Sequence, residues 1–387
     1  MTDRIEGVNR SRIKWCCDER DLSIEELFHQ LGISERTLNE FIEDKPALTF
    51  TQLEKIARKF NRGVLFFLEP EPVDPVRVHT PQFRTIMNQK PTLSPLIRTL
   101  IEKAEKQRDI YMAVQEELGE ESLKPWRQRL PRNIREGSIG ERALAVREWL
   151  DLEGVKDFEG YRQKVETQGV LVFLSNGYAG SWQIPKESTV RGFSLAHDIH
   201  PVIFIKKQRF PAPQTFTLFH ELAHLILHRK SFADEDEDLF SYQGKEKEAN
   251  EFAGMILVPD KYLDQVDVKL LRIGEIENLD ADLENYRKAW GVSTEVILRR
   301  LMDEKKISKL VYQSYRQWTD ANPIPEQAGG GARHRFSEPL RIFGRSFVGS
   351  ILEAVGADRL SLNKACGFLD NIKVSDIHRL EERRARL

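Results

Sequence analysis

Apolar residues dominate two stretches in the middle of the chain, both at helical spacing. Residues 216–228 read FTLFHELAHLILH and are apolar on nearly all sides, which predicts a helix buried in the core of its domain. Residues 246–258 read EKEANEFAGMILV, where an apolar stripe lies beside a polar face, and Pro259 ends the predicted helix. The first helix must therefore bury ionisable side chains, which need partners.

Shorter segments ahead of these helices run apolar or alternate as strands do. They predict a small mixed sheet from GVLVFLS (169–175), SWQI (181–184), RGFSLA (191–196) and PVIFIK (201–206). We expect residues 191–196 to form an edge strand whose free backbone pairs with an extended peptide. The run ADEDED at 233–238 predicts a solvated surface loop, because its carboxylates repel one another; a lid or a selector for basic substrates is the functional alternative.

The first 70 residues predict short helices with few strand signals. Ser23 and Glu26 form a capping-box pattern, Gly32 marks a turn, and Ser34 caps the following helix. This order of helix, turn and helix is typical of a helix-turn-helix. The predicted core is Leu27, Leu31, Ile33, Leu38, Phe41, Leu53, Ile56 and Ala57.

The sequence His220-Glu221-x-x-His224 has the spacing of a zinc hydrolase. Residues four apart share one helix face, so both imidazoles can reach one metal ion while Glu221 turns toward a metal-bound water as general base. Two core histidines hydrogen-bonded through the glutamate would be the structural alternative. Three ionisable groups in one buried turn make that alternative costly, and we favour a metal site with one Zn²⁺ per chain.

The third ligand is expected on the second helix. A metzincin would have Gly and His where this chain has Leu227 and Lys230, which excludes that class. Glu246 shares a face with Asn250 and is preferred over Glu248 as the ligand. Asn250 is expected to hydrogen-bond a ligand.

Other titratable side chains could support the site. His228 lies a further turn along the first helix, so it is expected to support the site rather than to bind the same ion. Candidates for stabilising an oxyanion are Tyr178, His197, His200 and Tyr242, although a structural role suits each of them better.

At these residues the chain resembles the ImmA/IrrE family of zinc metallopeptidases. The matching text is RGFSL (191–195), PVIFIKK (201–207), FTLFHELAHLILH (216–228) and E-x-x-A-N-x-F-A from Glu246 to Ala253. The resemblance implies that His220, His224 and Glu246 bind zinc and that Glu221 is the base for peptide hydrolysis. The N-terminal segment resembles the Xre (Cro/C1-type) helix-turn-helix domain that is often joined to this peptidase domain.

DNA contact is expected from residues 34–42, where Arg36, Thr37 and Asn39 are the candidates. Glu35 and Glu40 oppose the field of a duplex, so docking to a protein is the alternative role of this domain. The formal net charge of the chain is only -2, which gives no general attraction to nucleic acid or membrane.

Length and composition complete the domain prediction. The chain has 387 residues, 40% of them hydrophobic, enough for two or three domains. The expected fold class is α+β: a helix-turn-helix domain (1–75), a helical connector (76–138), a zincin-like domain (139–265), a helical extension (266–320), and a linker with a C-terminal helical module (321–387) for partner docking or oligomerisation. Three cysteines, no signal peptide and no membrane-spanning run favour a cytoplasmic protein without a membrane partner.

Three functions compete on this evidence. The first is a zinc endopeptidase that cleaves a repressor or partner protein and so switches transcription. The second is an antitoxin that binds and neutralises a cognate toxin, such as a nuclease, and regulates its own operator DNA. The third is transcriptional repression alone. Any of them is compatible with a homodimer.

Overall fold

The computed structural model describes residues 4–60, 62–119, 125–176, 180–241, 243–271, 274–323 and 334–385. It divides the chain into two compact units, Met1–Lys103 and Ala104–Leu387. Helices and a small mixed sheet confirm the predicted α+β class. Among the described residues, no helix combines the length and apolar character needed to cross a membrane.

The first unit is helical and has its own core. Its elements are α1 (Arg10–Asp18), α2 (Ile24–Gln30), α3 (Glu35–Ile42), α4 (Phe50–Lys59), η1 (Val64–Phe67), α5 (Pro75–Val78), α6 (Pro81–Gln89) and the start of α7 (Pro95–Glu117). Ser23 and Glu26 form the predicted capping box of α2, and Ser34 caps α3. Six of the eight predicted core side chains are buried, while Leu31 and Leu38 are partly buried against them. The helix-turn-helix prediction is therefore confirmed at the level of its helices and core.

The second unit is built around a four-stranded sheet in the order β1-β3-β2-β4. The strands are β1 (Leu171–Leu174), β2 (Val190–Leu195), β3 (Val202–Ile205) and β4 (Phe232–Glu235). β1 and β3 are parallel, whereas β2 is antiparallel to both β3 and β4.

Two strand predictions were wrong. Residues 181–184 contribute only an isolated bridge, between Gln183 and Asn176. β2 is an inner strand, because β4 pairs with the edge that we expected to be free.

β4 itself lies in the acidic run that we predicted to be a solvated loop. The prediction failed because Ala233 and Asp234 are buried, and only the later acidic residues reach the surface.

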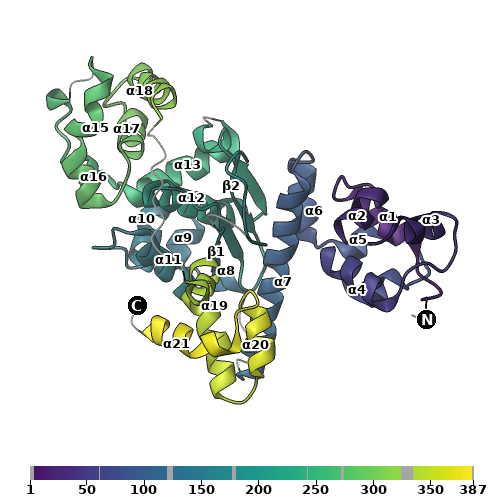
Figure 1. The fold of residues 1–387 in the computed structure, drawn as a ribbon. Coiled ribbons are helices and arrows are strands. Elements are labelled where there is room, and N and C mark those ends of the chain that lie inside the picture. The colour runs from purple at the N-terminus through teal and green to yellow at the C-terminus, as the bar shows by residue number, and fades with distance from the viewer. Residues whose placement is uncertain are drawn as a thin grey trace. The chain divides into compact units, whose positions relative to one another are not determined.

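Alternation along the strands gives the sheet two different buried faces. Val172, Leu174, Ile203 and Ile205 belong to the same core as α12 (Pro211–Ala223). On the other face, Phe173 makes edge contacts with Phe343 and Phe347 of α19 (Glu338–Gly356), and α19 packs on β1. Figure 1 shows α19 beside β1 in this unit. The C-terminal module is thus part of the sheet's packing.

The helix that carries the His motif changes geometry at its end. α12 continues into η2 (His224–His228), a π-helical turn in which the N–H of Arg229 donates to the carbonyl of His224 at 2.9 Å. After β4 and η3 (Asp238–Phe240), α13 (Gly244–Leu257) packs against α12, as Figure 1 shows. Both predicted central helices are therefore present and adjacent.

The remaining helices surround this centre. Those ahead of the sheet are α8 (Trp126–Arg129), α9 (Arg132–Arg135), α10 (Ile139–Trp149) and α11 (Phe158–Thr167). Those after α13 are α14 (Asp260–Leu263), η4 (Val268–Leu270), η5 (Ile276–Asn278), α15 (Leu279–Asp282), α16 (Glu284–Trp290), α17 (Thr294–Asp303) and α18 (Lys309–Ala321). The chain ends with η6 (Arg335–Ser337), α19, α20 (Leu362–Phe368), η7 (Val374–Asp376) and α21 (Ile377–Ala385).

Candidate metal centre

Two imidazoles face each other at the end of α12. His220 and His224 are fully buried, and their Nε2 atoms lie 3.1 Å apart. The helix packs beneath the sheet because Leu218, Phe219 and Leu222 join the core around β1 and β3. This packing removes water from both histidines, so their ring nitrogens must find partners within the protein.

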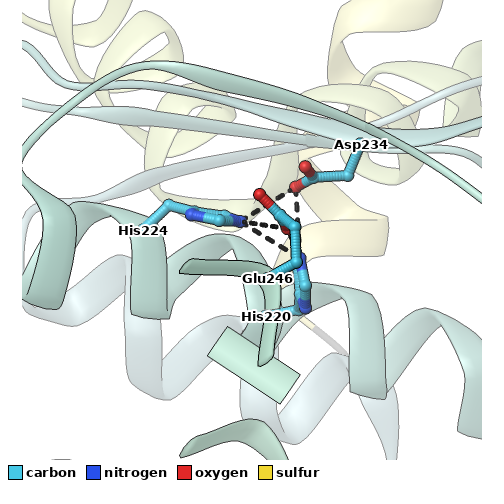
Figure 2. Close-up of side chains that lie close together, drawn as sticks. All are labelled: His220, His224, Asp234 and Glu246. Atoms are coloured by element: carbon cyan, nitrogen blue, oxygen red, sulfur yellow. Dashed lines mark hydrogen bonds and ion pairs between the residues drawn. The ribbon is translucent and has the colours of Figure 1, made fainter. Parts of the chain in front are cut away.

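Two carboxylates complete the group, as Figure 2 shows. Glu246 Oε2 lies 3.3 Å from Nε2 of each histidine, and Asp234 Oδ2 lies 3.3 Å from His220 Nε2 and 3.2 Å from His224 Nε2. The four candidate ligand atoms all lie within 4.8 Å of one another. Glu246 was predicted as a candidate ligand from the sequence, whereas Asp234, which comes from β4, was not.

A signal for Asp234 was present in the sequence. In the segment FADE (232–235), side chains alternate between the two faces of a strand, so Phe232 and Asp234 share one face. Phe232 is stacked on the ring of His224 with centroids 4.0 Å apart, and Asp234 points to the same histidine. The prediction of a solvated loop at 233–238 rested on the charges of the run and not on the alternation of its side chains.

Hydrogen bonds from outside the group orient His220. Its Nδ1 lies 2.9 Å from Asn250 Oδ1, and the Asn250 amide donates to the carbonyls of Asp238 and Ser241 at 3.0 and 3.3 Å. Because those two bonds fix the amide as donor, its oxygen accepts the proton of Nδ1. The Nε2 lone pair of His220 is then directed at the carboxylates. Asn250 thus makes the contact expected of it.

A second chain of contacts orients His224. Its Nδ1 lies 2.8 Å from Nδ1 of His228, and Nε2 of His228 lies 3.0 Å from Glu248 Oε2. A carboxylate accepts the Nε2 proton of His228, which leaves His228 Nδ1 to accept from His224. Nε2 of His224 then carries a lone pair, as in the carboxylate–histidine pairs behind many metal ligands. Glu248 is exposed and takes part in this chain through its contact with His228.

Glu221 lies beside the group, packed against a glycine. A Cβ on Gly192 would meet Glu221 Oε1 at 2.6 Å, Thr217 Cγ2 at 2.9 Å and the carbonyl of Phe204 at 3.0 Å. Only glycine on β2 permits so close an approach. Burial and the negative charge of Asp234 raise the pKa of Glu221 well above its ordinary value.

The pKa shifts in the group show that its carboxylates stabilise positive charge on the neighbouring histidines. Burial opposes ionisation of Asp234, yet the two histidines hold its pKa well below the ordinary value. Burial also lowers the pKa of His224, but Asp234 and Glu246 outweigh it and raise that pKa to about 9. Without another cation, protons on the histidines must balance the carboxylates.

The residues present fit a divalent metal ion. Among the described residues, Asp234 Oδ2 and Glu246 Oε2 are buried without a hydrogen-bond partner, as are both oxygens of Glu221. Ligand atoms about 2.0–2.1 Å from a tetrahedral zinc ion lie about 3.3 Å from one another. The distances from the imidazoles to each other and to the carboxylates, 3.1–3.3 Å, match that spacing.

A cavity of about 210 Å³ begins one helical turn before His220. Its lining combines apolar side chains with charged ones, which are Phe216, Leu239, Phe240 and Val296 on the one hand and Arg191, Asp236, Glu295 and Arg299 on the other. Phe216 also lies near the ring of His220, with centroids 6.4 Å apart. The cavity could therefore hold a side chain of a molecule bound at the metal group.

Of the four oxyanion candidates, the two that the structure describes, His197 and His200, do not join this group. Tyr178 and Tyr242 lie outside the described residues. His200 Nδ1 lies 2.9 Å from the carbonyl of Gly169. His197 is largely buried, with its Nε2 3.9 Å from Glu105 Oε1, and burial lowers its pKa to about 3. Both described histidines therefore have structural surroundings.

The three candidate DNA contacts on α3 differ in accessibility. Thr37 is buried, and its hydroxyl lies 2.9 Å from that of Ser34, so it does not fit the expected base-reading role. Asn39 is exposed. Arg36 is 85% exposed and pairs with Glu40 at 2.9 Å. α3 therefore offers an amide and a partly neutralised cation.

The fold and the site together define a helix-turn-helix domain joined to a zincin-like domain. Residues 13–67 match the family described as helix-turn-helix, and residues 165–302 match the peptidase family M78, described as the IrrE N-terminal-like domain. A comparison with curated proteins found no match. The chain thus combines an Xre-like helix-turn-helix domain with an IrrE/ImmA-like peptidase domain, as its motifs indicated.

Proposed function

We propose that the protein is a zinc-dependent endopeptidase coupled to a DNA-binding regulator, and that it cleaves a repressor or partner protein. The observation that carries this proposal is the convergence of His220, His224 and Glu246 on one point beside Glu221. A scaffold needs no buried carboxylate beside its ligands, whereas peptide hydrolysis needs a base in that position.

The chain's own residues divide the work. His220, His224 and Glu246 would hold the ion, and Asn250 and His228 would keep the imidazole lone pairs directed at it. Zinc would supply a Lewis acid for the scissile carbonyl and make water more acidic. Glu221 accepts a proton from the attacking water and returns it to the leaving amine. Burial and a raised pKa suit Glu221 to both halves of that transfer.

The substrate is a polypeptide with an apolar side chain near the cleaved bond. Support comes from the cavity that begins one helical turn before His220, since the aromatic and aliphatic part of its lining suits such a side chain. Operator DNA would be a second partner, bound through α3.

The test compares wild type with Glu221→Gln in an extract of the native cell. Both proteins should hold one zinc per chain by elemental mass spectrometry, since the substitution preserves shape and removes only the base. New protein N-termini should arise with wild type alone. The same set of new N-termini from Glu221→Gln would remove Glu221 as base, and absence of zinc from both would remove the metallopeptidase proposal.

An antitoxin remains the second candidate because Asp234 adds a fourth protein ligand atom, its Oδ2, beside the imidazoles. Closed sets of four protein ligands are typical of structural metal sites. In that case a cognate toxin would form a stable stoichiometric complex with wild type and with Glu221→Gln, and would stay intact in both.

A further inference from the structure

β4 occupies the edge at which a peptide would pair with the sheet. β2 passes over the His helix, as the contact between Gly192 and Glu221 shows, and β4 is antiparallel to β2 along this edge. Peptides that extend a sheet bind to such an edge through main-chain hydrogen bonds. In this chain the edge of β2 is already filled by the chain itself.

One side chain of β4, that of Asp234, also belongs to the group of candidate metal ligands. Asp234 is opposite Gly192 in the strand pair, and its Oδ2 is as close to both imidazoles as Glu246 Oε2 is, at 3.2–3.3 Å. Asp234 is 1% exposed, and Oδ2 has no hydrogen-bond partner among the described residues. A buried carboxylate that faces two imidazole nitrogens in this way has the surroundings of a metal ligand.

We infer that Asp234 is a fourth protein ligand of the metal ion and that β4 is a resident blocking strand, so that the chain holds its metal in a closed resting form. This inference rests on the proposed function. Catalytic zinc sites keep one position open for water or substrate, and Asp234 fills that position here.

The attachment of β4 suits a strand that can be exchanged. It pairs with the sheet on one side only. Polar contacts hold its ends: Ser231 Oγ accepts from Ala196 N–H at 3.0 Å, Thr189 donates to Glu235 at 2.8 Å, and Asp236 pairs with Arg191. An extended polypeptide could replace the main-chain pairing of β4 with β2 by its own while it removes Asp234 from the ion. The activating partner is therefore a polypeptide that adds as a strand beside β2.

The test uses the full chain loaded with Co²⁺, whose visible absorption reports coordination, and acetohydroxamate as a probe of an open position. Wild type is compared with Asp234→Ala, and with Asp234→Asn, which keeps the side chain's shape should alanine impair folding. Glu237→Gln is the matched control, because Glu237 belongs to the same acidic run but is exposed. The probe should bind at least about tenfold more tightly to the two Asp234 variants, since only a minor open population of wild type could accept it.

The absorption spectrum should also change between wild type and the Asp234 variants, and Glu237→Gln should behave as wild type in both measurements. Equal probe affinity and equal spectra in wild type and both Asp234 variants would overturn the inference and leave the metallopeptidase proposal intact. Failure of wild type to bind Co²⁺, or binding that Glu246→Ala does not weaken, would instead overturn the proposed function.

Discussion

Carboxylates gather in two parts of this protein with opposite consequences. Around His220, the fully buried Asp234 and the partly exposed Glu246 face two fully buried imidazoles, so the group calls for a cation. On α3, the partly exposed Glu40 pairs with Arg36, whose side chain is 85% exposed, and with Arg4. The two regions differ in the burial of the partners. Fully buried imidazoles leave the first pair of carboxylates with the geometry of candidate metal ligands, whereas exposed arginines in the second region are neutralised at little energy.

The largest expected effect is loss of the metal in Glu246→Ala. Loss of an outer hydrogen-bond partner lowers metal affinity by about tenfold to a hundredfold, and removal of a ligand carboxylate should cost at least as much. Competition with a chelator would measure the loss. Glu251→Ala, on the same helix but outside the group, is the control. Equal affinity in both variants would mean that burial alone does not make Glu246 a ligand.

The next effect is that of Gly192→Ala. The added methyl has no room beside Glu221, so we expect a loss of about 1–3 kcal/mol in the free energy of unfolding, together with loss of hydrolysis. Denaturant unfolding would measure the first and the appearance of new N-termini the second. Gly367→Ala, where a Cβ meets open space, should retain both properties. Unchanged stability and activity in Gly192→Ala would show that the sheet yields without displacing the base.

A smaller effect is expected for Glu248→Ala. Its carboxylate fixes the proton of His228 and, through it, the lone pair of His224. Zinc affinity should fall by about tenfold, less than for Glu246→Ala, because the ligands themselves remain. His228→Ala should cause a similar loss, and the double variant should lose no more than either single one. Additive losses would show that the two residues do not act in one chain of contacts.

The smallest effect is expected on α3. Glu40→Gln removes one negative charge and releases Arg36 and Arg4, so affinity for duplex DNA at low salt should rise a few-fold, equivalent to about 0.2–1 kcal/mol. Fluorescence anisotropy with labelled genomic fragments would measure it. Thr37→Ala should leave affinity unchanged, because Thr37 is buried. No response to Glu40→Gln would favour protein docking as the role of this domain.

The sequence by itself determined the local parts of this protein. Periodicity predicted the two central helices, cap residues predicted where α2 and α3 begin, and spacing four residues apart predicted that His220 and His224 share a face. These features depend on neighbours in the chain, so a short window of sequence contains the information.

Tertiary structure alone decided the contacts between distant segments. The pairing of β4 with β2 placed Asp234 at the imidazoles and covered the edge predicted for a peptide. The packing of α13 on α12 brought Glu248 to His228. α19 came from the C-terminal module to cover the aromatic face of the sheet. A run of acidic residues predicts solvent exposure on average, but strand register selects which of them is buried, and register depends on the partner strand.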